Sequence, residues 1–395
     1  MERVYAALSI SLITNKRFTI YCDNAIESTA HFIEDILQPC GFNDEQYTII
    51  DLLEYKNIED ILHQSTILNT NGDLEFKNTV IWQNLQQLDQ LRQKQLYKFI
   101  LQVENYNKNL SSCDSQSVTI TSNGSSFNVV KPLIFTIIPF LEYNLYNNKI
   151  YPYLKEMFWS SVTIPPVTTT YNEFVHFVPE YKSTILQLRS KIDMVYVNPT
   201  IKSYIYSLIV FIRCHRLASL APKSVRVPTA TITYVEDFCK SSVLWRRQLQ
   251  SNRISMTDTT VATTSNDENE NVLQKTATAA ADLELEQESE LFVTPEYVKI
   301  AIKIVGYWLV DWETNRKFAN TEDLKLDEND DITLKKTLDN KKLEISMLTG
   351  DWYGSEYYCA NELLKGYKAK RDVKSPTGMT NRIVDDAIEE VRPPM

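Results

Sequence analysis

Short apolar runs alternate with amphipathic segments over residues 1–160. The apolar runs predict four strands, at Arg17–Cys22, Tyr47–Leu52, Asn78–Trp82 and Lys131–Phe140. The segments between them have the 3.6-residue spacing of helices at Glu27–Leu37, Ile58–His63 and Leu88–Val103. Apolar strands that alternate with helices favour a parallel sheet that is covered on both faces. The run Val4–Ile13 comes before all of these and predicts a first buried strand.

From about residue 198 onward the pattern becomes helical. Asn198 followed by Pro199 predicts a helix start, because Asn caps a helix and Pro suits its first position. One face of this helix carries the apolar residues Ile201, Tyr204, Ile205, Leu208, Ile209 and Ile212. Thr294 and Pro295 open a second helix, whose core side is Val298, Ala301, Ile302, Val305, Trp308, Leu309 and Trp312. We therefore predict an α/β core over residues 1–180 and an all-α, lid-like domain over residues 181–395.

Three segments have neither pattern. Residues 105–128 are rich in Ser, Asn and Thr and predict a mobile surface insertion in the core. Residues 255–290 are acidic, with almost no aromatic or branched side chains, which predicts a disordered insertion in the helical domain. Residues 316–342 form a second, charged insertion.

Charge is sorted along the chain. The net charge of −10 disfavours a general binder of polyanions. Residues 182–253 nevertheless carry 12 Lys and Arg against 3 Asp and Glu. A candidate basic contact surface for nucleic acid or an acidic partner consists of Lys202, Arg213, Arg216, Arg226, Arg246 and Arg247. The favoured alternative is that these are solvated helix-end charges with buried stems. The acidic segment 258–290 is expected to fold back and mask this basic region.

The usual motifs of catalysis are missing. None of the 8 glycines precedes a lysine, so the phosphate-binding sequence G-x-x-x-x-G-K-[ST] does not occur. G-x-G-x-x-G, G-x-S-x-G and H-E-x-x-H are absent as well. Cys214 and His215 are adjacent, but neighbours on a helix point about 100° apart, so we expect a core thiol and a helix-end imidazole. The sequence predicts no catalytic residue, metal or cofactor.

The 6 cysteines have no C-x-x-C spacing, which favours reduced, buried thiols. No apolar run reaches the length of a membrane span, and residues 1–16 lack the cleavage site of a secretory signal. We expect an intracellular protein, nuclear or cytoplasmic, without membrane contact.

One stretch resembles a known nucleotide-binding family. Residues 79–96 run from a strand through a polar pair and a short turn into a helix rich in Gln and Leu. This arrangement resembles the Walker B segment of the MoxR and magnesium-chelatase branch of AAA ATPases. There the strand ends in Asp-Glu, which serve Mg²⁺ and the attacking water. Gln83 and Asn84 stand here instead, and the strand that should lead into a phosphate loop ends in Cys22-Asp23-Asn24 without a glycine.

The resemblance implies a degenerate P-loop or AAA-like core that has lost hydrolysis, because neutral amides supply neither an anionic metal ligand nor a general base. An ordinary α/β unit without ATPase ancestry remains the alternative.

A second resemblance covers most of the chain outside the insertions. Its stretches are Tyr153–Trp159 with Ile164-Pro165-Pro166, Tyr204–Arg213 with His215-Arg216-Leu217, Phe292–Val298, and Ile383–Pro394. In order and spacing they resemble the fungal maintenance of telomere capping family. The resemblance implies a role in telomere capping without an assigned molecular activity. We therefore expect a non-catalytic scaffold with protein partners; the alternatives are binding of nucleic acid or an acidic partner through residues 182–253, and residual ATP binding.

Overall fold

A computed structural model describes residues 1–55, 57–69, 73–104, 116–122, 125–143, 150–164, 177–215, 227–262, 291–310 and 371–394; for residues 253–262 it describes the backbone alone. A five-stranded sheet lies at the centre of the fold. Its strands are β1 (Arg17–Cys22), β2 (Tyr47–Asp51), β5 (Thr79–Gln83), β8 (Thr136–Glu142) and β9 (Phe158–Thr163). Their order is β2-β5-β8-β1-β9, and every neighbouring pair is parallel.

The burial of these strands confirms the predicted covered sheet. Every residue of β1, β5 and β9 is buried, and so is every residue of β8 except Glu142. The edge strand β2 alternates between buried and exposed positions. The four predicted strands correspond to β1, β2, β5 and β8. The sequence analysis missed β9, because Ser160 and Ser161 interrupt its apolar run although both are buried.

The three helices predicted for the first half are confirmed, with small changes at their ends. They are α2 (Ala25–Phe32), which continues as a π-helical segment over Ile33–Leu37, α3 (Ile58–Ser65) and α4 (Gln90–Glu104). A short helix, α5 (Pro152–Glu156), leads into β9. Single 3₁₀ turns occupy Asp44–Gln46, Leu85–Gln87 and Ile192–Met194.

The first element is a helix, α1 (Glu2–Ile13), so the strand predicted over Val4–Ile13 is wrong. A short apolar run reads equally as a buried strand or as a buried helix. The helix contacts β1 and β9 on one side and the helices α6 (Tyr181–Ser190) and α9 (Thr231–Ala262) on the other. Because it is covered on both sides, it is apolar nearly all round and has no polar face that would reveal its period.

A second sheet corrects the prediction that residues 105–128 are a mobile surface insertion, because residues 116–122 and 125–128 belong to its strands. It has the order β3-β4-β7-β6, with β3 at Thr66–Leu68, β4 at Leu74–Phe76, β6 at Gln116–Ser122 and β7 at Ser125–Lys131. The alternating side chains Val118, Ile120 and Val129 are buried, and β6 packs beside α4. The polar positions between them hid this two-residue period. Residues 105–115 and 123–124 lie outside the described residues.

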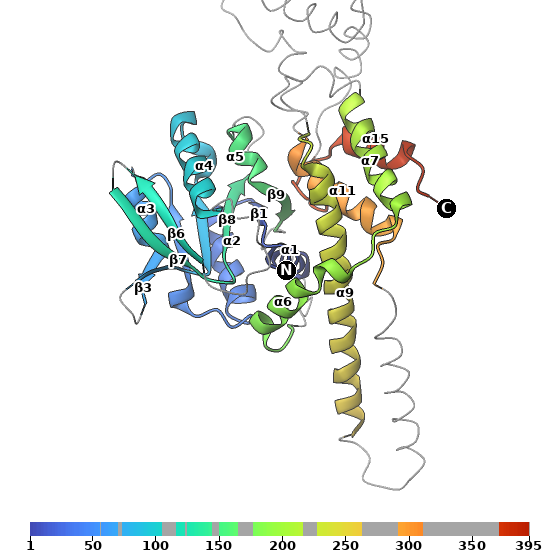
Figure 1. The fold of residues 1–395 in the computed structure, drawn as a ribbon, viewed down its shortest axis with the longest axis horizontal. Coiled ribbons are helices and arrows are strands. Elements are labelled where there is room, and N and C mark those ends of the chain that lie inside the picture. The colour runs from blue at the N-terminus through green and yellow to red at the C-terminus, as the bar shows by residue number, and fades with distance from the viewer. Residues whose placement is uncertain are drawn as a thin grey trace, which may run out of the picture.

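The second half is helical, as predicted. It consists of α6, α7 (Pro199–Cys214), α9, α11 (Pro295–Leu309) and α15 (Arg382–Glu390), and α7, α9, α11 and α15 gather beside β9 (Figure 1). The Asn198 side chain accepts from the N–H of Thr200 at 2.9 Å, and all six predicted apolar residues of α7 are buried.

Helix α9 continues to Ala262, so the expected disorder from residue 255 is wrong for residues 255–262. Residues 263–290 and 316–342 and Trp312 lie outside the described residues. The division of the chain at residue 180 remains a prediction.

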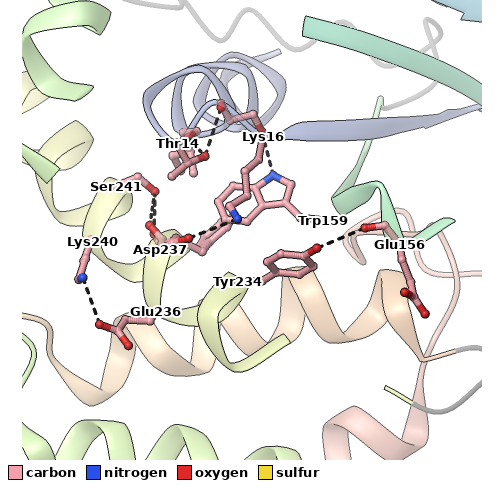
Figure 2. Close-up of polar contacts among 12 residues, drawn as sticks. Thr14, Lys16, Glu156, Trp159, Tyr234, Glu236, Asp237, Lys240 and Ser241 are labelled. Atoms are coloured by element: carbon pink, nitrogen blue, oxygen red, sulfur yellow. Dashed lines mark hydrogen bonds and ion pairs between the residues drawn. The ribbon is translucent and has the colours of Figure 1, made fainter. Parts of the chain in front are cut away.

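Lys16 joins the sheet to α9 (Figure 2). Its ammonium lies 3.3 Å from a carboxylate oxygen of Asp237 and 4.5 Å from the centre of the Tyr234 ring. Trp159 of β9 lies beneath it and donates from Nε1 to the Ser11 hydroxyl at 3.2 Å. Burial raises the pKa of Asp237, and Lys16 offsets only part of this effect. The junction between the sheet and α9 therefore contains one half-buried ion pair among aromatic rings.

Candidate functional site: the carboxyl edge of the parallel sheet

In open parallel sheets, ligands bind beyond the carboxyl ends of the strands. At this edge Asp51 ends β2, Gln83 ends β5 and Glu142 ends β8, while Asp23 and Asn24 follow β1. β1 neighbours β8, and β8 neighbours β5, so the end of β1, where a phosphate loop would begin, and the segment that resembles Walker B lie at the same edge. This edge is the candidate site.

The start of α2, where a phosphate would bind to free backbone N–H groups, is filled by the protein's own acceptors. The Asn24 side chain accepts from the N–H of Ile26 at 3.0 Å and from that of Glu27 at 3.5 Å. The N–H of Ala25 donates to the Glu142 carboxylate at 3.1 Å. These three donors are thus satisfied by a side-chain amide and a carboxylate, and the carboxylate would repel a phosphate.

The two amides at the end of β5 are held by structural hydrogen bonds. Gln83 is buried and donates from Nε2 to the Thr29 hydroxyl at 3.0 Å. Asn84 has a left-handed backbone with φ 63°, and its Nδ2 donates to Asp51 at 2.8 Å. Asp51 also accepts from the N–H of Leu53 at 2.9 Å. The end of β5 therefore offers no carboxylate, and the nearby Asp51 already accepts two hydrogen bonds.

Residues 371–379 lie against the same edge from the far end of the chain. Arg371 forms an ion pair with Asp23, and its guanidinium lies 5.0 Å from the centre of the Tyr143 ring. The Thr163 hydroxyl at the end of β9 donates to the Ser375 carbonyl at 2.7 Å. Burial raises the pKa of Tyr143 to about 12, so this ring stays neutral. We call residues 371–379 the edge segment; it contacts the chain beyond β1, β8 and β9.

Sequence reasoning missed Glu142, Tyr143 and Arg371 at this site. An acid that closes the most apolar strand was a usable signal for Glu142, because the carboxyl end of such a strand is where ligands bind. Arg371 has no signal of this kind, because only the fold brings a residue 348 positions away to Asp23.

Of the six predicted basic contact residues, Arg216 and Arg226 lie outside the described residues. Lys202 pairs with Glu236 at 3.4 Å. Arg213 donates to the Val227 carbonyl at 3.1 Å and to the Thr229 hydroxyl at 3.3 Å.

The other two predicted residues, Arg246 and Arg247, are neighbours on α9, and the Arg246 guanidinium lies 5.9 Å from the Tyr297 ring centre. Lys240 also pairs with Glu236, at 3.1 Å. Burial alone would raise the pKa of Glu236, but Lys240 and Lys202 outweigh it and lower that pKa. The described basic side chains with resolved contacts thus bind groups of the chain itself.

Cys214 and His215 are adjacent at the end of α7. The His215 imidazole contacts Asp386 of α15 at 3.2 Å, as expected for a side chain that points away from the thiol. Cys214 is exposed, so the prediction of a core thiol at this position is wrong. Cys22, Cys40 and Cys239 are buried and free, as predicted for reduced thiols.

Within the described ranges, no group of three or more His, Cys, Asp and Glu side chains could hold a metal ion. In the same ranges, no helix is long and apolar enough to cross a membrane.

No protein-family model matches the chain, and no curated protein matches it. Two solved structures are similar to it at low identity. One is described as a "putative ATPase" from Cytophaga hutchinsonii, with 10% identity, a TM-score of 0.44, and coverage of 86% of this chain and 87% of that one. The other is a full-length MCM homologue from Methanopyrus kandleri, with 12% identity, a TM-score of 0.40, and coverage of 79% and 55%. Similarity at this level carries no conclusion about activity.

The strand order itself characterises the fold. Numbered along the chain, the five parallel strands lie in the order 5-1-4-3-2. The fold is a parallel α/β core followed by a helical region.

Proposed function

We propose that the chain is a non-catalytic, AAA-like scaffold that acts by binding other proteins. The observation that carries this proposal is the hydrogen bond from the Ala25 N–H to the Glu142 carboxylate. It places a fixed anion at the helix end where an active relative would bind the phosphates of its nucleotide.

Electrostatics support the same proposal. Asp23 and Glu142 add two carboxylates to an edge that would have to receive a triphosphate, and a nearby like charge disfavours binding. The cation Arg371 reaches this edge, and it is paired with Asp23. Mg²⁺ requires hard oxygen ligands, usually including carboxylates, but Gln83 and Asn84 are neutral.

We also propose the cellular process in which this scaffold acts, which is telomere maintenance. The resemblance of Tyr153–Trp159, Tyr204–Arg213 and Ile383–Pro394 to the fungal telomere capping family motivates a role in telomere maintenance through protein partners. Direct binding of nucleic acid is a less favoured route, because Lys202 and Arg213 are engaged by groups of the chain.

Calorimetric titration with MgATP tests the absence of nucleotide chemistry. We expect neither saturable binding nor turnover from the wild type or from Asp51→Asn. The Asn variant keeps an acceptor oxygen for the Leu53 N–H and removes the carboxylate to which Asn84, after β5, donates. Saturable micromolar binding with turnover that Asp51→Asn abolishes would overturn the proposal.

A cellular experiment tests the scaffold role. In cells that carry Asp51→Asn in place of the wild-type gene, the single-stranded telomeric overhang is expected to keep the wild-type length, whereas deletion of the gene is expected to change it. A longer overhang in cells that carry Asp51→Asn at wild-type protein level would contradict a role without nucleotide chemistry. If deleting the gene leaves the overhang unchanged, the telomere link fails while the scaffold proposal stands.

A further inference from the structure

Four charged side chains meet at the amino end of the sheet, opposite the candidate site. Arg17 begins β1, Glu104 ends α4, Lys131 ends β7 and Arg189 lies near the end of α6. Arg17 and Glu104 form an ion pair, and the charges of Arg17, Glu104 and Arg189 all act on the Lys131 ammonium. We call these four residues the amino-end cluster; it holds three cations and one carboxylate.

The positive charge of this cluster is only partly balanced. Arg189 donates to the Leu12 carbonyl at 2.6 Å and to the Leu133 carbonyl at 2.7 Å, so its partners are neutral. Leu12 lies in the last turn of α1, where the helix dipole favours a cation but supplies less than one full negative charge. Glu104 therefore remains the one full negative charge in the cluster.

The most buried of these cations has an unused donor. The Arg17 side chain is 7% exposed, and its Nε is buried without a hydrogen-bond partner among the described residues. A buried donor without a partner is costly, and a buried charge is stable only when it is paired and hydrogen-bonded. The Glu104 side chain is 40% exposed, so solvent reaches the rim of the cluster.

We infer that the amino-end cluster is a binding site for a doubly charged oxyanion of the size of phosphate. Three cations against one carboxylate leave an excess that a dianion would neutralise. Several oxygen atoms on one ligand can accept from arginine and lysine donors together, which is the geometry that phosphate recognition uses. The inference rests on these charges and this burial and is independent of the proposed function.

The protonation of Lys131 should make phosphate binding at this site depend on pH. The pKa of Lys131 is lowered to about 8, first by burial and then by the positive charges of Arg17 and Arg189, which the negative charge of Glu104 opposes. Arginine does not titrate in this range, and the second pKa of inorganic phosphate lies about one unit above the value near 6 of a phosphate ester. Between about pH 8 and about pH 10, Lys131 would thus lose its remaining proton while inorganic phosphate stays a dianion.

Calorimetric titration of the full chain with inorganic phosphate tests this site, with chloride at matched ionic strength as the control for screening. We expect one phosphate per chain. Lys131→Gln should weaken binding about tenfold, because it removes one charged donor. Glu104→Gln should strengthen binding, because it removes the competing carboxylate. Lys299→Gln on α11, outside the four elements of the cluster, is the matched control and should change nothing.

The pH dependence separates this site from general attraction to positive charge. Wild-type affinity should fall several-fold between about pH 8 and about pH 10, where the phosphate stays a dianion, and Lys131→Gln should show no such fall. Absence of phosphate binding, or binding that Lys131→Gln and Glu104→Gln both leave unchanged, would overturn the inference. Circular dichroism of each variant checks that the protein remains folded.

Discussion

Gly378 lies directly against the ring of Tyr143. Its φ is +74°, and a Cβ built on it would lie 2.0 Å from Cε1 of Tyr143, far inside van der Waals contact. The left-handed backbone and the close approach both require glycine here. Through this contact the edge segment packs against the carboxyl edge of the sheet, beside the ion pair of Arg371 with Asp23.

Replacement of Gly378 by alanine should therefore loosen the edge segment. Gly41 is the matched control, because it has φ +78° and no atom within 4 Å of the added Cβ. Gly41→Ala should cost about 1 kcal/mol of unfolding free energy from backbone strain alone, and Gly378→Ala about 2 kcal/mol or more. Urea denaturation measures both values. Equal costs for the two variants would show that Tyr143 does not hold the segment.

The candidate site shows how far sequence reasoning reaches. The sequence predicts parallel strands that alternate with helices, and such strands align their carboxyl ends, which brings the strand ends at Asp23 and Gln83 to one sheet edge. The absence of a phosphate loop also followed from the residues. The closure of the edge by Glu142 and Arg371 did not, because these contacts depend on which strands are neighbours and on where the chain returns after α11.

Short sequence patterns predicted some elements of the fold and missed others. Asn198 and Pro199 marked the start of α7 correctly, because a cap acts within a few residues. The helix α1 was predicted as a strand, because α9 and the sheet cover it on both sides and remove its polar face. Strand β9 was missed because Ser160 and Ser161 interrupt its apolar run, although both are buried in a strand that α11 and α1 contact.

Asp237 and Glu236 are neighbours on α9 with opposite pKa shifts. Burial raises the pKa of Asp237 in the folded state, so its protonated form is favoured there. Its contribution to stability is present below the ordinary aspartate pKa and is lost as the pH rises through the raised value. Lys240 and Lys202 lower the pKa of Glu236, so its contribution appears above the ordinary glutamate pKa and is lost as the pH falls.

Two variants separate these contributions. Asp237→Asn should remove a loss of stability that begins as the pH rises above about 4, and Glu236→Gln should remove a loss of stability that begins as the pH falls below about 4.5. Chemical denaturation of each variant on both sides of these values measures the slopes. The same slope change in both variants would contradict the opposite shifts.

Asn24 is expected to contribute to stability as the cap of α2. Asn24→Ala removes the acceptor of the Ile26 N–H and should cost about 1 kcal/mol, measured by thermal unfolding. Asn24→Ser keeps a capping oxygen and is the control, with a cost of a few tenths of a kcal/mol. MgATP should restore stability to neither variant. A nucleotide-dependent rise in the melting temperature of Asn24→Ala would indicate that phosphates reach this helix end.

Thiol reactivity should distinguish Cys214 from the buried cysteines. Burial raises the pKa values of Cys22 and Cys40 to about 12 each, so neither forms appreciable thiolate at neutral pH, whereas Cys214 is exposed. In a chain whose Cys113 and Cys359 are replaced by Ser, a chromogenic disulfide reagent should modify one thiol of the native protein rapidly. The remaining thiols, including Cys239, should react only after unfolding in denaturant.

The variant Cys214→Ser is the control for this assignment, because it should abolish the rapid phase and leave the slow phase unchanged. Rapid reaction of a second thiol in the native protein would mean that the strand end at Cys22, or the turn at Cys40, opens to solvent. Opening at Cys22 would be the more informative result, because this thiol lies one residue before Asp23 and so reports on the carboxyl edge itself. If the edge segment controls access to that edge, the reagent should modify Cys22 faster in Gly378→Ala than in the protein with Gly378.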